Sequence, residues 1–268
     1  MTENAFEAIA GRSVGDSRSD PDKSVGDSRS DRSRPPLLLL CDHASNALPP
    51  GGLGLDPALL STHIAYDIGA AAVTRALAMA YGAPALLGSW SRLLIDLNRG
   101  EDDPTLVMKL SDGSIIPGNR TADAAEVARR IARYHAPYHA AIDAELDRIG
   151  QGAVLVSMHS FTPSWKGRPR PWETGVLYDR DVRLAKPLMA RLAEVGFTVG
   201  DNEPYSGALE GDTLWRHGTC RGLPHVLIEM RQDLVGTGEQ AQDFALRLKP
   251  ILDAAIRDMA SSSKAAGH

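Results

Sequence analysis

Three short apolar runs each lead into a residue that can bind a metal ion or transfer a proton. The run LLLLCDH ends at His43, AVLVSMH ends at His159, and HVLIEM contains Glu229. Such aliphatic runs are typical of strands buried on both faces, as in a parallel sheet covered by helices. In an open α/β sheet, residues that leave the carboxyl ends of the strands converge on the ligand site. Two histidines and a glutamate at one edge therefore indicate a metal-dependent hydrolase, although a histidine after a strand is often only a hydrogen-bonded loop residue.

The elements that must position these residues alternate between strands and helices from Leu37 onward. Asp56 and Pro57 are expected to begin the first helix, Thr121 is expected to cap the second, and Pro137 to kink it. Strands separated by long helices need crossover connections, which favour a mostly parallel sheet. We predict a single three-layer α/β domain with a mixed, mostly parallel sheet flanked by helices. The predicted strands are 37–43, 83–88, 92–99, 153–160, 197–202 and 225–233, and the predicted helices are 56–81, 121–150, 181–196 and 239–261.

The first 34 residues differ in composition from the rest of the chain. The string SVGDSRSD occurs at 13–20 and again at 24–31, and the segment is rich in Ser, Asp, Arg and Gly. Such a segment buries too little apolar area to offset the entropy cost of ordering it. We therefore predict a disordered tail over 1–34, one α/β domain over 35–262 and a flexible C-terminus over 263–268.

Composition and charge disfavour several classes of function. A net charge of -5 argues against nucleic acid or an anionic membrane as partner, so a small molecule or peptide is the expected substrate. No apolar run approaches the roughly 20 residues of a membrane span, and the N-terminus lacks the features of a signal peptide. Two cysteines, Cys41 and Cys220, fit a reducing compartment, and we predict a cytoplasmic location. The sequence does not indicate an oligomeric state.

The metal-competent residues lie within longer strings. The chain contains, in this order, CDHASNALP, HIAYDIGA, SRLLIDLNR, RYHAPYHAAID, MHSFTP and LIEMRQDL. From about Leu37 to Met259 this series resembles the N-formylglutamate amidohydrolase family. The resemblance implies a zinc-dependent amide hydrolase with a phosphorylase/hydrolase-like fold related to the zinc carboxypeptidases. It also implies an N-acyl amino acid as substrate, above all N-formyl-L-glutamate, which is split into formate and L-glutamate in histidine catabolism.

The resemblance implies that His43 and His159 bind zinc. Carboxypeptidase-type sites take a glutamate three residues after the first histidine, but that position is Asn46, which is a poor zinc ligand. We predict that Asp67 completes the ligand set; alternatively, Asp67 only hydrogen-bonds His43 from behind. Asp42 is a further candidate. Nitrogen and oxygen ligands also accept iron, cobalt or manganese, so the sequence does not fix the metal.

Glu229 is the predicted catalytic acid and base. Two histidines and a carboxylate leave zinc one open position for a water, whose pKa falls to about 7. A carboxylate must then carry the proton to the leaving amine. An unpaired Glu229 in an apolar strand would be costly, and the alternative to a catalytic role is an ion pair with Arg231 or another arginine. His217, beside Arg216 in a loop, is predicted to stabilise the developing oxyanion.

Arginines are expected to bind the carboxylates of the substrate through two parallel hydrogen bonds. Arg92 and Arg99 stand at opposite ends of the predicted strand 92–99, so only one of them is expected to reach the site. We prefer Arg99, at the carboxyl end, with Asp96 and Asn98 orienting it. Further candidates for substrate binding lie in loops: Arg120 and Arg216.

Other features complete the expected site. His135 and His139 have the i, i+4 spacing of some metal sites, but Pro137 lies between them, so core packing and hydrogen bonding are expected for both. The long loops 160–175 and 201–218 are expected to wall the site. Besides N-formylglutamate hydrolysis, two functions stay open: hydrolysis of another N-acyl amino acid or peptide, and non-catalytic ligand binding, which the asparagine at position 46 would favour.

Overall fold

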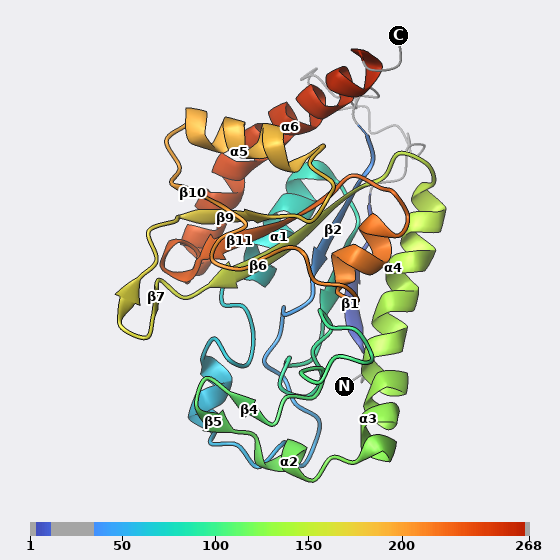
Figure 1. Ribbon diagram of the computed structural model, residues 1–268, viewed down its shortest axis with the longest axis vertical. Helices are drawn as coiled ribbons and strands as arrows, with labels where there is room; N and C mark the ends of the chain where they lie inside the picture. The colour runs from blue at the N-terminus through green and yellow to red at the C-terminus, as the bar shows by residue number, and fades with distance from the viewer. Residues whose placement is uncertain (1–3, 12–34, 266–268) are drawn as a thin grey trace, which may run out of the picture.

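A seven-stranded mixed sheet forms the centre of the computed structural model, which describes residues 4–11 and 35–265, with side chains to 262 (Figure 1). Neighbouring strands are parallel except at two places, where β1 runs antiparallel to β3 and β9 antiparallel to β11. The prediction of a mixed, mostly parallel sheet is confirmed. The order across the sheet is β1 (Phe6–Ile9), β3 (Ala85–Gly88), β2 (Leu37–Cys41), β6 (Val154–Phe161), β11 (His225–Arg231), β9 (Thr174–Leu177) and β10 (Val199–Asp201).

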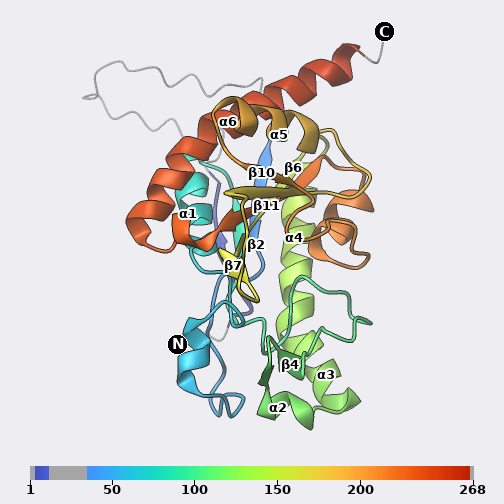
Figure 2. The same ribbon diagram turned by 60° about the vertical axis from the view of Figure 1, so that its left-hand side comes forward.

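Helices cover both faces of the sheet. Figure 2 shows the strands between α1 (Ala70–Tyr81) and α6 (Gly238–Ala265) on one side and α4 (Ala136–Ile149) on the other. The helix α5 (Ala185–Glu194) packs beside α6. The three layers are those that the alternating pattern predicts. No helix in the described part of the chain is long and apolar enough to cross a membrane.

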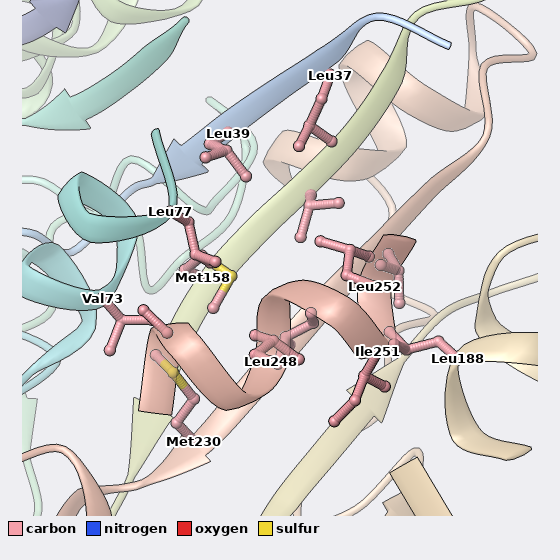
Figure 3. Packing of buried hydrophobic residues seen from close by; sticks show 14 of the residues in the cluster. Leu37, Leu39, Val73, Leu77, Met158, Leu188, Met230, Leu248, Ile251 and Leu252 are labelled. Carbon is pink, nitrogen blue, oxygen red and sulfur yellow. The ribbon is translucent and has the colours of Figure 1, made fainter. Parts of the chain in front are cut away.

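The buried faces follow from strand alternation. On β11, Val226, Ile228 and Met230 join the core beneath α1, α5 and α6, whereas Leu227 joins the core beneath α4. Figure 3 shows the first of these cores, in which Met158 of β6 and Met230 lie among leucines of α6. Every residue of β2 and β6 is buried, as the continuous apolar runs predict.

A third hydrophobic cluster lies beyond the ends of the strands, in the part of the chain that carries β4, β5 and α2 (Figures 1 and 2). It packs side chains of segments that are mostly irregular, including Leu93, Ile95 and Ile116. The short elements of this part and of the loops are η1 (Pro57–Ser61), β4 (Leu110–Ser111), β5 (Ser114–Ile115), α2 (Pro117–Arg120), α3 (Ala124–Arg130), the π-helical turns η2 (Ile131–His135) and η3 (Trp215–Thr219), β7 (Ser164–Trp165), β8 (Arg168–Pro169) and η4 (Gln232–Leu234).

The predicted helix 56–81 is wrong in its first half. Asp56 caps only the 3-10 helix η1, and α1 begins at Ala70. Gly69 precedes α1 with a φ of 83°, and a Cβ there would stand 2.2 Å from the carbonyl oxygen of Val235. Only glycine accommodates both this positive φ and the close approach of Val235, so the chain turns at Gly69 and α1 begins directly after it.

The predicted strand 92–99 is also wrong, because the segment forms turns. Arg92 donates two hydrogen bonds to the carboxylate of Asp96, and Asp96 accepts one from the backbone N–H of Asn98. The hydroxyl of Ser91 accepts from the N–H of Leu93. Such local side-chain bonds compete with an extended conformation, so the apolar side chains between them pack without a sheet.

Three predicted boundaries also change. Asp123, not Thr121, caps α3. The predicted helix 121–150 is interrupted by the π-helical turn η2, which ends before Pro137, and Pro137 lies in the first turn of α4. Phe6–Ile9 of the predicted tail forms β1, so this part belongs to the sheet, while the repeat at 13–31 lies outside the described residues. At the other end α6 continues to Ala265, beyond the predicted domain end at 262.

Candidate active site

Two histidines and an aspartate meet at the carboxyl ends of the central strands. His43 follows β2, His159 lies near the end of β6, and Asp67 lies in the turn before α1. One ligand atom from each of the three buried side chains lies within 4.8 Å of the other two. The Oδ2 atom of Asp67 is 2.8 Å from Nδ1 of His159 and 3.4 Å from Nδ1 of His43. The structure thus brings together the three predicted metal ligands.

The outer nitrogen of each histidine faces another carboxylate. Nε2 of His43 is 2.7 Å from Oδ1 of Asp96, and Nε2 of His159 is 3.0 Å from Oδ2 of Asp42. A carboxylate at Nε2 favours the tautomer with the proton on that nitrogen, which leaves the lone pair of Nδ1 for a metal ion. Two imidazole nitrogens and one carboxylate oxygen therefore fit a divalent cation such as zinc.

The two outer carboxylates are themselves held in place. Asp42 accepts hydrogen bonds from the hydroxyls of Tyr138 at 2.8 Å and Thr213 at 3.0 Å. Burial would raise its pKa, but the hydrogen bond and the charge of His159 lower the pKa of Asp42 to about 2. Asp42, the further candidate for a ligand, thus lies behind His159. Asn46 donates to the backbone oxygen of Leu60 and takes no part in the group.

Glu229 stands next to the group formed by His43, Asp67 and His159. It is the register partner of His159 on the parallel pair β11 and β6, and it is only 6% exposed. Its Oε2 atom has no hydrogen-bond partner in the described part of the chain. Burial raises the pKa of Glu229 to about 7. The alternative ion pair with Arg231 is absent, because that guanidinium binds Asp233 at 2.8 Å.

A cavity of about 290 Å³ opens in front of these residues. Its wall contains the three predicted metal ligands, Glu229, and both Arg92 and Arg99. The prediction that only one of these arginines reaches the site is wrong, because segment 92–99 is folded into turns rather than extended. Arg92 is bound by Asp96, and its Nη1 atom also lies 3.6 Å from Asp67.

Arg99 reaches the cavity from the end of this folded segment. Its guanidinium donates to Thr105 at 3.2 Å and to the backbone oxygen of Asn98 at 2.8 Å. The side chain of Asn98 accepts from the backbone N–H of Thr213 at 3.1 Å. Asn98 therefore supports Arg99 with its backbone and anchors the opposite loop with its side chain.

Three other predicted site residues are absent from the cavity wall: Arg120, Arg216 and His217. Arg120 is exposed in α2, and the half-exposed Arg216 lies 3.9 Å from Glu101. His217 is fully buried. Their positions do not support the predicted roles in substrate binding and oxyanion stabilisation.

His217 instead belongs to a buried chain of histidines. Its Nε2 atom is 2.8 Å from Nδ1 of His139, and its Nδ1 atom is 3.0 Å from Asp143. His135 contacts the backbone oxygen of Arg99 at 2.9 Å. The expectation of packing and hydrogen bonding for His135 and His139 is confirmed. Burial lowers the pKa of His139 to about 2 and that of His217 to about 4.

Two further buried carboxylates, Asp96 and Asp212, belong to the site. The prediction that Asp96 orients Arg99 is wrong, because Asp96 binds His43 and Arg92. Asp96 lies in the apolar run LLIDLN. A buried carboxylate without a partner is costly, so its place in this run indicates that Asp96 is paired. Asp212 lines the cavity from a loop, where no local pattern marks it. Burial raises the pKa of Asp212 to about 6.

Comparison with known proteins identifies the family. The gene product Atu2144 from Agrobacterium tumefaciens is 36% identical, with 84% of this chain and 92% of that chain covered and a TM-score of 0.80. An N-formylglutamate amidohydrolase from Ralstonia eutropha has the same fold, with 22% identity, 97% and 98% coverage and a TM-score of 0.63. No curated protein matches significantly. The model of the N-formylglutamate amidohydrolase family matches residues 35–235. The chain therefore belongs to the N-formylglutamate amidohydrolase family and is a hydrolase that acts on amide bonds.

Proposed function

We propose that the protein hydrolyses the amide bond of an N-acyl amino acid with a divalent metal ion, zinc in the first place, bound by His43, Asp67 and His159. N-formyl-L-glutamate, which would yield formate and L-glutamate, is the substrate that the family name suggests. The observation that carries this proposal is the convergence of two imidazole nitrogens and one carboxylate oxygen within 4.8 Å. Beside them lies Glu229, whose Oε2 atom has no hydrogen-bond partner among the described residues. Asp67 offers the carboxylate that Asn46 cannot, so the asparagine does not favour a binding protein.

The bound metal would supply Lewis-acid polarisation of the amide carbonyl and a water with a lowered pKa. Glu229 would accept a proton from the attacking water and pass it to the nitrogen of the leaving amine as the amide C–N bond breaks. Its Oε2 atom can hold the proton between the two transfers, because it has no hydrogen-bond partner in the described part of the chain. Arg99 binds a carboxylate of the substrate, while Arg92 holds Asp96 against His43.

The cavity favours a small substrate. Its volume of about 290 Å³ lies at the lower end of the range of small-molecule sites, roughly 300–1,000 Å³. An N-acyl amino acid fits such a volume better than a polymer does.

The test combines metal content with turnover. Wild-type protein is expected to bind about one zinc per chain and to release amino acid from N-formylated substrates in a chelator-sensitive reaction. His159→Ala should lose both the zinc and the activity. His63→Ala is the matched control, because His63 lines the cavity but lies outside the ligand group, so its zinc content should stay near one per chain. Full activity in a metal-free preparation would disprove the proposal.

A further inference from the structure

The cavity extends beyond Glu229 along strand β11. Glu229, Leu227 and His225 are alternate residues of this strand and therefore point to the same face, and all three line the cavity. Four residue steps along a strand span roughly 13 Å. The cavity thus has a second end, well away from the metal-binding group.

Leucines form the walls of this second end. Leu177 of β9 is the register partner of Leu227, and both belong, with Leu214, to the buried cluster beneath α4. Leu209 is half-buried and also lines the cavity. We call the part of the cavity bounded by Leu177, Leu209, Leu214 and Leu227 the leucine arm. It lies between β9 and β11 on one side and the segment that leads into η3 on the other.

Two polar side chains that border the leucine arm, those of His225 and Tyr178, have partners within the protein. His225 contacts the backbone oxygen of Leu223 at 2.7 Å and the hydroxyl of Thr219 at 3.2 Å. The hydroxyl of Tyr178 donates to Asp201 at 2.8 Å. These two groups therefore do not need a hydrogen bond from a polar substituent of the substrate.

Charge also disfavours an acidic group in the leucine arm. The carboxylates of Asp179 and Asp212 lie in the wall of the cavity. Among the described residues of this wall, Arg92 and Arg99 are the arginines, and there is no lysine. Both arginines belong to the turn segment 92–99, whose Asp96 contacts the metal-ligand candidate His43. A second carboxylate of the substrate would meet like charges and leucines in the arm. Burying a charge without a partner is costly.

We infer that the leucine arm binds an apolar chain of the substrate, so that the preferred substrate is an N-acyl amino acid with one carboxylate near Arg99 and an aliphatic group in the arm. The inference rests on the proposed function and narrows its substrate class. The aliphatic group has two possible sources, the side chain of the amino acid or the acyl chain, and both offer the same chemistry to the arm.

Three substrates separate these sources: N-formyl-L-glutamate, N-formyl-L-leucine and N-hexanoyl-L-glutamate. Each buried methylene favours binding by roughly fourfold, so the substrate that fills the arm should exceed N-formyl-L-glutamate at least tenfold in kcat/KM. A gain with N-formyl-L-leucine assigns the arm to the side chain, and a gain with N-hexanoyl-L-glutamate assigns it to the acyl chain. N-formyl-L-glutamate as the best of the three would overturn the inference and leave the proposed function intact.

Product binding tests the arm without turnover. Calorimetry on the zinc-loaded full chain should show tighter binding of leucine or hexanoate than of glutamate. If no substrate is hydrolysed, the proposed function fails, and the binding order alone then decides whether the arm selects apolar groups. Glutamate as the tightest ligand would overturn the inference.

Variants of the arm give the third test. Leu209→Phe fills the arm at a half-buried position and should lower kcat/KM for the preferred apolar substrate at least tenfold. Leu214→Phe should act in the same direction, and Leu209→Arg should shift the preference toward N-formyl-L-glutamate. Leu246→Phe, at an exposed leucine of α6, is the matched control. Unchanged selectivity in all arm variants would contradict the inference.

Discussion

Glu229 and His159 are register partners on the parallel strands β11 and β6, and their side chains project from the same face of the sheet. The glutamate is therefore fixed beside the predicted metal ligand by the backbone ladder rather than by a loop. A site built on strands holds its geometry without a conformational change. Since the Oε2 atom of Glu229 has no hydrogen-bond partner within the part of the chain that the structure describes, this atom is available to a substrate.

Glu229→Gln should keep the metal and lose turnover. The amide has nearly the same size but cannot accept the proton, and general acid-base catalysis contributes on the order of 10²–10⁴ in rate. We expect kcat to fall by about this factor with zinc content unchanged, measured by elemental analysis beside the activity assay.

Loss of zinc in Glu229→Gln would instead assign Glu229 to the ligand set and weaken the case for Asp67. Glu203→Gln, a change of the same type at an exposed position in a loop, is the matched control for both measurements.

Asp42→Asn and Asp96→Asn should each weaken metal binding by roughly 10–100-fold, because each carboxylate orients one histidine from behind. The measurement is a competition titration of zinc against a chelator. Asp233→Asn, which alters the exposed ion pair with Arg231, should leave zinc affinity unchanged. Equal affinities for all three variants would show that the outer carboxylates do not support the ligands.

The sequence predicts the strand-borne part of the site better than the loop-borne part. His43 and His159 follow continuous apolar runs, and β2 and β6 are buried throughout, so the pattern and the structure agree. Segment 92–99 also contains a short apolar run, but hydrogen bonds of Ser91 and Asp96 to the nearby backbone fold it into turns. Local polar contacts of this kind have no periodicity, which is why the approach of Arg92 to the cavity could not be predicted.

Deletion of residues 1–34 should destabilise the protein, in contrast to what a disordered tail predicts. Phe6 on β1 packs on the core beneath α4, with its ring 6.4 Å from that of Tyr138. Phe6 is half-buried, and the deletion also removes the buried Ala5 and the pairing of β1 with β3, so the total cost is about 2 kcal/mol. A change of 1 kcal/mol shifts Tm by roughly 2–4 °C in a domain of this size. We therefore expect Tm to fall by about 5 °C or more in a thermal melt.

The matched control for this deletion is Glu7→Gln on the same strand. It removes only the exposed ion pair of Glu7 with Arg75 of α1. Exposed pairs contribute about 0–1 kcal/mol, so its Tm should change little. An unchanged Tm in the deletion would show that β1 adds no stability to the sheet.

The buried histidine chain should make stability depend on pH in a defined direction. Burial lowers the pKa of His217 to about 4, below the usual value of about 6.5 in an unfolded chain. Between these values the unfolded chain binds more protons, so the free energy of unfolding falls as the pH falls from about 6.5 to 4. The loss is at most about 1.4 kcal/mol per pH unit for this histidine.

Comparison with His217→Gln isolates this contribution. Glu229 and Asp212 have raised pKa values, so the folded state binds their protons more readily and their contributions to stability increase as the pH falls over part of the same range. These opposite contributions are present in both proteins and cancel in the difference. Urea unfolding at a series of pH values, with both proteins in the same metal state, should show the advantage of the wild type shrinking steadily from pH 6.5 to 4. A difference that does not vary with pH would mean that His217 is protonated in the folded protein, with its proton stabilised by Asp143.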